Sequence, residues 1–220
     1  MSKSQVMTAI EASKELFFRL ATEIWNRPEI SYQERESAAL QKDALREFGF
    51  RVAELDEIQA NAFIAEFGTG SPVIGLLGEY DALPGLSQKV SAEQEAVISG
   101  GPGHGCGHNL LGTACLAAAT GIRAALEAGH LKGTVRYYGC PAEEQIGKPA
   151  LAKAGVFGGL DRAVLAPGRH QYRGGLWYEC LSGADFSLQR PIVPRCAGAT
   201  PGQIGPGRPY VNERGGRIPT

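Results

Sequence analysis

The segment that most constrains the fold of this chain is the apolar stretch from Leu110 to Ala128. It is rich in Leu and Ala, carries little charge, and repeats its apolar residues with the period of an α-helix. A helix without a broad polar face is buried on most sides. The sequence therefore predicts a helix that other elements largely cover.

A glycine-rich loop, residues 103–109 with the sequence GHGCGHN, leads directly into this helix. It offers two imidazoles, His104 and His108, and one thiol, Cys106, all of which are ligands for transition metals. Cys106 and His108 are two residues apart with a glycine between them, so both side chains can reach one ion from a loop. A lone Cys or His in such a loop is usually structural, whereas the cluster predicts a metal site.

Apolar periodicity and turn residues predict the remaining elements. Ser31 and Glu34 have the spacing of a capping box at the start of the second helix. A polar, glycine-containing loop is expected over residues 84–103. We expect helices over 4–25, from just after Ser31 to about Phe48, and from Pro149 to Phe157, and strands over 51–55, 61–67, 72–77, 134–140 and from 162.

Two pairs of carboxylates follow predicted strands. Glu79 and Asp81 come after the apolar strand that ends at residue 77, and Glu143 and Glu144 come after the strand 134–140. In open α/β sheets the carboxyl ends of strands commonly face a binding site. Adjacent acids suit a division of labour in which one binds a metal and the other transfers protons. The pattern indicates an α/β fold carrying a metal-assisted hydrolase.

Composition excludes several classes of function. A net charge of -1 argues against general affinity for nucleic acid or for an anionic membrane, and we expect neither partner. No apolar run approaches the length expected of a membrane span, and no signal peptide is evident. The five cysteines are odd in number and scattered, unlike a disulfide framework, so a cytoplasmic location is expected. Cys115 and Cys140 are interpreted as small buried residues.

The motifs Gly78-Glu79-Tyr80-Asp81-Ala82-Leu83-Pro84, His104 to Asn109 and Glu143-Glu144 together resemble the aminoacylase/carboxypeptidase-type metallohydrolases. The similarity covers about residues 5–165 and is strongest to the amidohydrolase branch that includes the aminobenzoyl-glutamate hydrolases. It implies the N-terminal part of a two-metal, aminopeptidase-like catalytic domain. Asn109 stands where many members of the family carry Asp.

The resemblance also implies roles for single residues. Cys106, His108 and Glu144 would be metal ligands for zinc or manganese, and Glu143 would be the general base and acid. Asp81 would orient a ligating imidazole. The implied substrate is a small-molecule amide, either an N-acyl amino acid or an aminobenzoyl-glutamate type compound. Relatives dimerise through an inserted domain that this chain lacks.

The resemblance stops near Leu165. Relatives continue with Trp-His-Pro, which supplies a further ligand, whereas this chain continues with residues 166–170, APGRH. A natural disordered tail is one interpretation. The other is translation out of frame, because shifted codons permit Trp-His-Pro at 165–168 and a family-like Lys-Gly-Arg-Ser-Ser-His-Ala-Ala at 189–197.

We favour the second interpretation, with a partial catalytic domain over 1–164 and a largely unstructured, out-of-frame tail over 165–220. No function is then assigned to the chemically notable residues of the tail, which are His170, Trp177, Tyr178, Cys180 and Cys196.

Three hypotheses for function follow. By lineage the chain is a metal-dependent amidohydrolase that cleaves an amide bond. As it stands, it is instead a catalytically inactive fragment, and this interpretation is favoured for the 220-residue chain. The third is a zinc-binding structural module built on Cys106 and His108, which ranks last because structural zinc normally has four protein ligands.

Overall fold

The computed structural model describes residues 3–165 of the chain. The predicted tail, except for Leu165, and the residues named within it lie outside this range. The helices are α1 (Lys3–Glu11), α2 (Lys14–Trp25), α3 (Arg35–Glu47), α4 (His108–Glu127), η1 (Glu143–Gln145, a 3₁₀ turn) and α5 (Lys148–Lys153). The strands are β1 (Arg51–Glu54), β2 (Phe63–Thr69), β3 (Val73–Gly78), β4 (Gly133–Gly139) and β5 (Arg162–Leu165).

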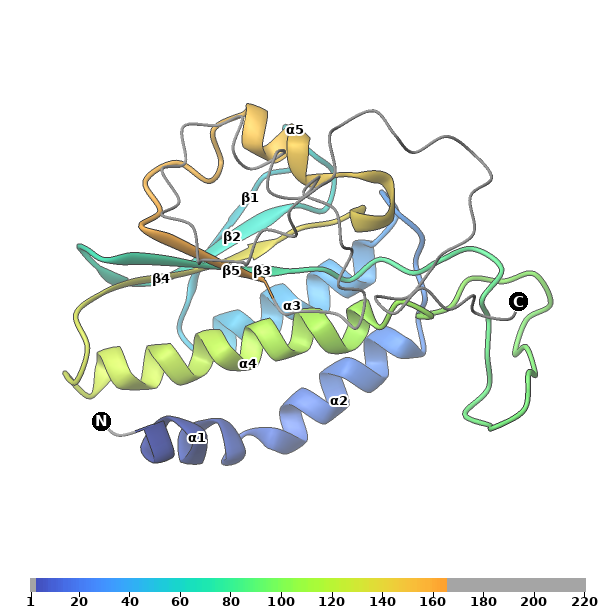
Figure 1. Ribbon diagram of the computed structural model, residues 1–220, viewed down its shortest axis with the longest axis horizontal. Helices are drawn as coiled ribbons and strands as arrows, with labels where there is room; N and C mark the ends of the chain where they lie inside the picture. The colour runs from blue at the N-terminus through green and yellow to red at the C-terminus, as the bar shows by residue number, and fades with distance from the viewer. Residues whose placement is uncertain (1–2, 166–220) are drawn as a thin grey trace, which may run out of the picture. The chain divides into compact units, whose positions relative to one another are not determined.

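The strands form one mixed sheet in the order β1-β2-β4-β3-β5 (Figure 1). β2 is antiparallel to both β1 and β4, whereas β3 runs parallel to β4 and to β5. Gly78 at the end of β3 pairs with Gly139 at the end of β4, so the segments that follow both strands leave the same edge of the sheet. This register confirms the α/β prediction and brings the two carboxylate pairs together.

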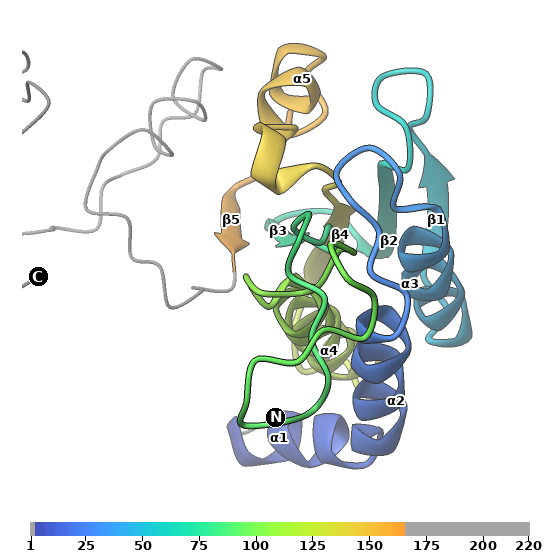
Figure 2. The same ribbon diagram turned by 90° about the vertical axis from the view of Figure 1, so that its right-hand side faces the viewer.

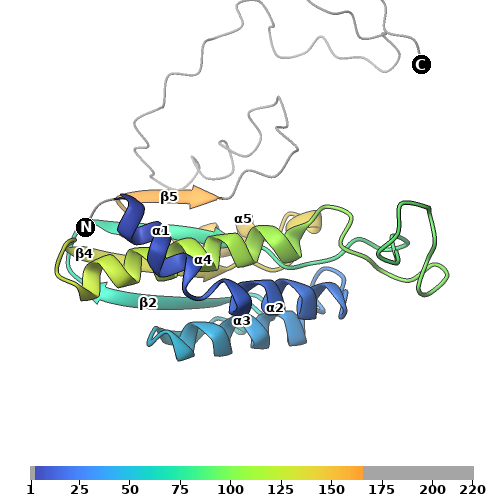
Figure 3. The same ribbon diagram turned by 90° about the horizontal axis from the view of Figure 1, so that it is seen from below.

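Helices cover both faces of the sheet. Figures 1 and 2 show α1 to α4 on one face and α5 on the other, and Figure 3 shows α4 running along the strands. Side chains alternate between the faces. Leu76 and Tyr137 belong to the larger core beneath α2, α3 and α4, while their neighbours Leu77 and Tyr138 belong to a smaller core beneath α5. Cys115 and Cys140 are both buried, as expected.

By length and composition alone, α4 could span a membrane, since it has 20 residues and a mean hydropathy of 1.3. The prediction that no apolar run approaches this length was therefore wrong. Half of the apolar window is buried inside the protein. α4 packs against β3, β4, α1 and α2. This packing is typical of the core helix of a globular domain.

The predicted helix 4–25 is divided in two by a turn at Ala12 and Ser13. Ser13 N donates to Ile10 O, and Leu16 N donates to Ser13 O. Both hydrogen bonds span three residues, as in a 3₁₀ turn, where an α-helix would span four. Both α1 and α2 pack against α4. The turn allows each of them to follow α4 separately, which apolar spacing does not reveal.

The predicted capping box was wrong, because neither side chain caps the helix that follows. Ser31 Oγ donates to Asp81 Oδ2 at 2.8 Å, and Glu34 Oε1 accepts from Ala142 N at 2.7 Å. The carboxylate of Glu29 supplies the cap, accepting from Glu36 N and from Ser37 N and Oγ at 2.8–3.0 Å.

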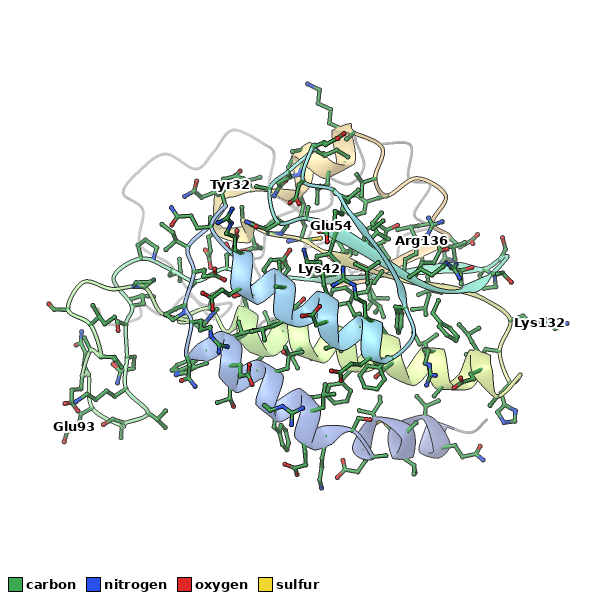
Figure 4. All side chains as sticks on the ribbon, turned by 180° about the vertical axis from the view of Figure 1, so that it is seen from behind. Tyr32, Lys42, Glu54, Glu93, Lys132 and Arg136 are labelled. Carbon is green, nitrogen blue, oxygen red and sulfur yellow. The ribbon has the colours of Figure 1, made fainter. Side chains whose placement is uncertain are left out.

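Residues 84–102 form the predicted loop between β3 and α4. A bridge between Leu83 and Gly103 closes its base. Figure 4 shows Glu93 near its far end, away from the sheet and helices. Residues 89–100 are all exposed. The loop thus extends outward while its two ends enter the core, one after Asp81 and the other before His108.

Candidate metal centre

Three chain segments meet at the edge of the sheet where β3 and β4 end. Glu79 and Asp81 follow β3, Glu143 and Glu144 lie in the η1 turn after β4, and His108 is the first residue of α4. Gly107 precedes α4 in the left-handed conformation, with φ 80°, which glycine adopts without a steric penalty. The sequence thus places an imidazole at the start of a buried helix, opposite two carboxylate-bearing turns.

The His108 ring has a different environment at each nitrogen. Nδ1 lies 2.8 Å from Asp81 Oδ1 and 3.0 Å from Asp81 O. Nε2 faces three carboxylates, with Glu143 Oε2 at 3.5 Å, Glu79 Oε2 at 3.6 Å and Glu144 Oε1 at 3.9 Å. The Asp81 contacts orient the ring so that Nε2 points at this group of carboxylates.

Cys106 completes a set of ligand atoms. The Cys106 sulfur, a His108 nitrogen and a Glu144 oxygen all lie within 4.8 Å of one another. Glu144 Oε1 is buried and has no hydrogen-bond partner in the described part of the chain, and buried polar atoms are rarely left so. Thiol, imidazole and carboxylate are a donor set that zinc accepts. These residues therefore fit a divalent cation.

Burial and neighbouring charges shift the pKa values of His108, Cys106 and Glu143. Burial lowers the pKa of His108, but the Asp81 hydrogen bond and the charges of Asp81 and Glu79 outweigh it and raise that pKa to about 9. Burial, with help from Glu144, raises the pKa of the Cys106 thiol to about 12. Burial and the Glu79 charge also raise the pKa of Glu143. In the absence of a metal, His108 and Cys106 retain their protons at neutral pH, and a cation would displace them.

Asp81 remains ionised. Burial alone would raise its pKa, but the bond to His108 and the bond from the Glu144 backbone N–H, at 3.0 Å, together lower it. Ser31 Oγ donates to the same carboxylate. One buried anion therefore joins the imidazole, the acidic turn after β4 and the segment before α3.

A buried ion pair lies beside this group. Lys148 Nζ contacts Glu79 Oε1, and the two residues are 3% and 4% exposed. The charge of Lys148 opposes the rise in the pKa of Glu143. Sequence reasoning missed Lys148, because a lysine at the start of a short helix gives no signal of burial.

The other polar residues of the metal loop have structural contacts. His104 Nε2 lies 3.1 Å from Ile24 O, and its ring stacks on Trp25 with 6.4 Å between centroids. Asn109 Nδ2 donates to Ala21 O at 3.1 Å, which joins α4 to α2. Of the two imidazoles in the loop, only His108 faces the carboxylates.

Glu34 and Gln59 also belong to the site, and sequence reasoning did not identify them. Burial raises the pKa of Glu34 to about 7, although backbone hydrogen bonds oppose the rise. Gln59 Nε2 donates to Pro141 O at 3.1 Å. Their partners are 108 and 82 residues away in the chain, so no local pattern indicates these contacts.

The chain is similar in sequence to known proteins. Residues 75–190 match peptidase family M20/M25/M40. The chain is 49% identical over 158 residues to a p-aminobenzoyl-glutamate hydrolase subunit of Escherichia coli, covering 71% of this chain and 33% of that protein. It is 34% identical over 180 residues to human Xaa-Arg dipeptidase, covering 71% and 36%.

Among solved structures, a dinuclear metal-binding peptidase of the M20 family from Bacillus subtilis superposes with a TM-score of 0.56 at 27% identity. The match covers 68% of this chain and 42% of that protein. The chain spans about a third of the length of the curated relatives described above.

Proposed function

The chain belongs to peptidase family M20/M25/M40, and we propose that its residues 3–165 carry the metal-binding and proton-transfer part of an amidohydrolase site. One observation carries this proposal. The buried His108 Nε2 faces Glu79, Glu143 and Glu144 within 3.9 Å, while Cys106 lies beside them. Such a concentration of anionic and thiol ligands around one imidazole is expected of a cation site.

Cys106, His108 and Glu144 would hold the metal ion. Zinc is preferred over manganese, because thiolate is a soft ligand that zinc accepts and manganese disfavours. A bound divalent cation would polarise an amide carbonyl and lower the pKa of a water molecule. The B. subtilis relative is described as a dinuclear metal-binding peptidase, which supports a second metal ion in the complete site.

Glu143 would transfer the proton. It lies next to the ligand Glu144, and its Oε2 is 3.5 Å from His108 Nε2, so it borders the cation position without belonging to the ligand set. Its raised pKa suits a group that first accepts a proton from water and then gives it to the leaving amine. Asp81 would keep Nδ1 of His108 engaged, so that Nε2 remains available to the metal.

The proposed substrate is a small amide in which an acyl group is joined to an amino acid. Support comes from the names of the relatives, a p-aminobenzoyl-glutamate hydrolase subunit and an Xaa-Arg dipeptidase. The name of the E. coli relative as a subunit supports a protein partner as well. Dimerisation through an inserted domain and the cytoplasmic location stay predictions.

A second candidate is a non-catalytic, metal-binding fragment. The observation that favours it is the size of the ligand set, because the described residues contribute three ligand atoms to one group. Two ions need more ligands than these. The two candidates agree on the metal and differ on turnover.

Zinc binding and hydrolysis, measured on the same preparations, test both candidates. We expect the chain to bind zinc. Cys106→Ser and Glu144→Gln each remove a ligand atom, so each should weaken zinc binding by more than the loss of a supporting partner does, which is about 10- to 100-fold. The matched control is Glu127→Gln, an exposed carboxylate at the end of α4 that pairs with Arg123. Release of p-aminobenzoate from p-aminobenzoyl-glutamate reports turnover.

Zinc-dependent turnover that Glu143→Gln abolishes, with zinc binding retained, would establish the hydrolase. Zinc binding without turnover would establish the fragment. A chain that binds no zinc, or whose binding is insensitive to Cys106→Ser and Glu144→Gln, contradicts both.

A further inference from the structure

The turn that presents Glu143 and Glu144 has an unusual backbone. It comprises residues 141–147 and is called the acidic turn below. Ala142 and Ile146, on either side of η1, both adopt the left-handed conformation, with φ 56° and 57°. This conformation is unfavourable for residues that carry a Cβ, and for a β-branched residue it is rare. The acidic turn therefore persists only if surrounding contacts hold it.

Side chains from two distant segments hold the peptide unit between Pro141 and Ala142. Glu34 Oε1 accepts from its N–H at 2.7 Å, and Gln59 Nε2 donates to its C=O at 3.1 Å. All four residues are buried, and Glu34 and Ala142 are fully so. The peptide is thus fixed at both polar ends, which prevents it from rotating.

The rest of the acidic turn is also held by close contacts. A Cβ at Gly147 would lie 2.4 Å from Pro141 O and 2.5 Å from Gln59 Nε2, so only glycine fits there. Gly147 N donates to Ala142 O at 2.8 Å, which closes the turn. Asp81 Oδ2 accepts from Glu144 N at 3.0 Å. The acidic turn is therefore held before and after Glu143, the residue that transfers the proton.

We infer that Glu34 is a positioning residue, which with Gln59 fixes the Pro141–Ala142 peptide and thereby sets where Glu143 and Glu144 meet the cation. The inference rests on the proposed function, since it concerns the same site. Glu34 reaches the metal through the backbone of the acidic turn and does not touch the ligand atoms. An oxygen remains to accept from Ala142 N whether or not the carboxyl group is ionised.

Cobalt(II) titration of the whole chain tests the inference, with absorption of the Cys106 thiolate–cobalt bond as the readout. Glu34→Leu removes both oxygens, and Glu34→Asp shortens the side chain so that it no longer reaches Ala142 N. We expect each to weaken cobalt binding about 10- to 100-fold, as for other losses of a supporting partner. Glu34→Gln keeps an accepting oxygen and should stay within about threefold of the natural chain.

A rescue distinguishes positioning from general loss of structure. Glycine adopts the left-handed conformation without a Cβ penalty, so Ala142→Gly should restore part of the binding lost in Glu34→Leu. The matched control is Glu29→Leu, which removes the cap of α3 in the same region but no contact to the acidic turn. It should lower the melting temperature without changing the cobalt spectrum.

The outcomes separate the two claims. If the natural chain binds no cobalt, the proposed function fails and the inference falls with it. If cobalt binds through Cys106, the inference is wrong when Glu34→Leu and Glu34→Asp bind as the natural chain does, or when Glu34→Gln is as weak as Glu34→Leu. Should Glu34→Leu fail to fold, Glu34→Asp decides.

Discussion

The buried carboxylate of Asp81 contacts two parts of the candidate metal centre, the His108 ring and the acidic turn. Its carboxylate accepts from His108 Nδ1, Ser31 Oγ and Glu144 N at 2.8–3.0 Å. The contact to His108 leaves Nε2 facing the other carboxylates, and the contact to Glu144 holds the acidic turn in place. A single buried anion therefore couples the orientation of the imidazole to the position of the acidic turn.

The raised pKa of His108 predicts how the metal-free protein responds to pH. Its value in the fold is about 9, above the ordinary 6.5. The folded state therefore binds the proton more tightly than the unfolded state does. This stabilisation is complete below pH 6.5 and is lost as pH rises to 9, on the order of 3 kcal/mol in total. The Cys106 thiol, with a pKa of about 12, adds to this loss of stability only above pH 9.

Urea unfolding in the presence of a chelator, from pH 6.5 to 9, measures this loss. Asp81→Asn removes the charge that most favours the imidazolium, so its stability should be lower at pH 6.5 and change less with pH. Asp43→Asn, on the exposed side of α3, is the control and should follow the natural chain. A natural chain whose stability rises with pH in this window would contradict the assignment.

At the scale of elements, α4 positions the site by packing closely on the segment after β3. A Cβ at Gly112 would lie 2.1 Å from Glu79 O and 2.8 Å from Gln41 Nε2. Gly112→Ala should therefore destabilise the fold by about 1–3 kcal/mol, although alanine favours a helix by about 1 kcal/mol. Because α4 starts at His108, the same change should weaken zinc binding.

Gly121→Ala, on the same helix, is the matched control. A Cβ there would meet the side-chain ends of Ile10 and Val6 at 2.8–3.0 Å, which can move aside. We expect a smaller loss of stability and unchanged zinc affinity. If Gly112→Ala leaves the zinc affinity as unchanged as Gly121→Ala does, α4 does not set the position of His108.

Most elements could be predicted from sequence because their signals are local. Apolar runs marked β2, β3, β4 and α4 within a few residues of their bounds, and the carboxylates at the ends of β3 and β4 are adjacent to those runs. The set Cys106, His108 and Glu144 comes from the family resemblance, and the structure brings one ligand atom of each within 4.8 Å of the others.

The supporting residues could not be predicted, because their roles depend on distant contacts. Ser31 and Glu34 have the spacing of a helix cap, yet their partners are 50 and 108 residues away. Lys148 has an ordinary position at the start of a helix, yet it pairs with a carboxylate 69 residues away. Only the mixed sheet, with β2 antiparallel and β3 parallel to β4, makes these pairs neighbours.

For the whole molecule, we expect the purified 220-residue chain to hydrolyse p-aminobenzoyl-glutamate and N-acyl amino acids negligibly, even with zinc bound. The described residues place one three-ligand group together, and an activated water needs a complete metal environment. Rates with zinc, with manganese and with a chelator should be indistinguishable. Strong metal-dependent turnover would refute the fragment interpretation and leave the amidohydrolase assignment intact.

The central claim is that Cys106, His108 and Glu144 hold one metal ion. X-ray absorption at the zinc edge, on the chain with one equivalent of zinc, tests it most directly. We predict one sulfur neighbour at about 2.3 Å with nitrogen and oxygen neighbours at about 2.0–2.2 Å. Cys106→Ser should lose the sulfur neighbour. A zinc environment without sulfur, or one that Cys106→Ser leaves unchanged, would contradict the account.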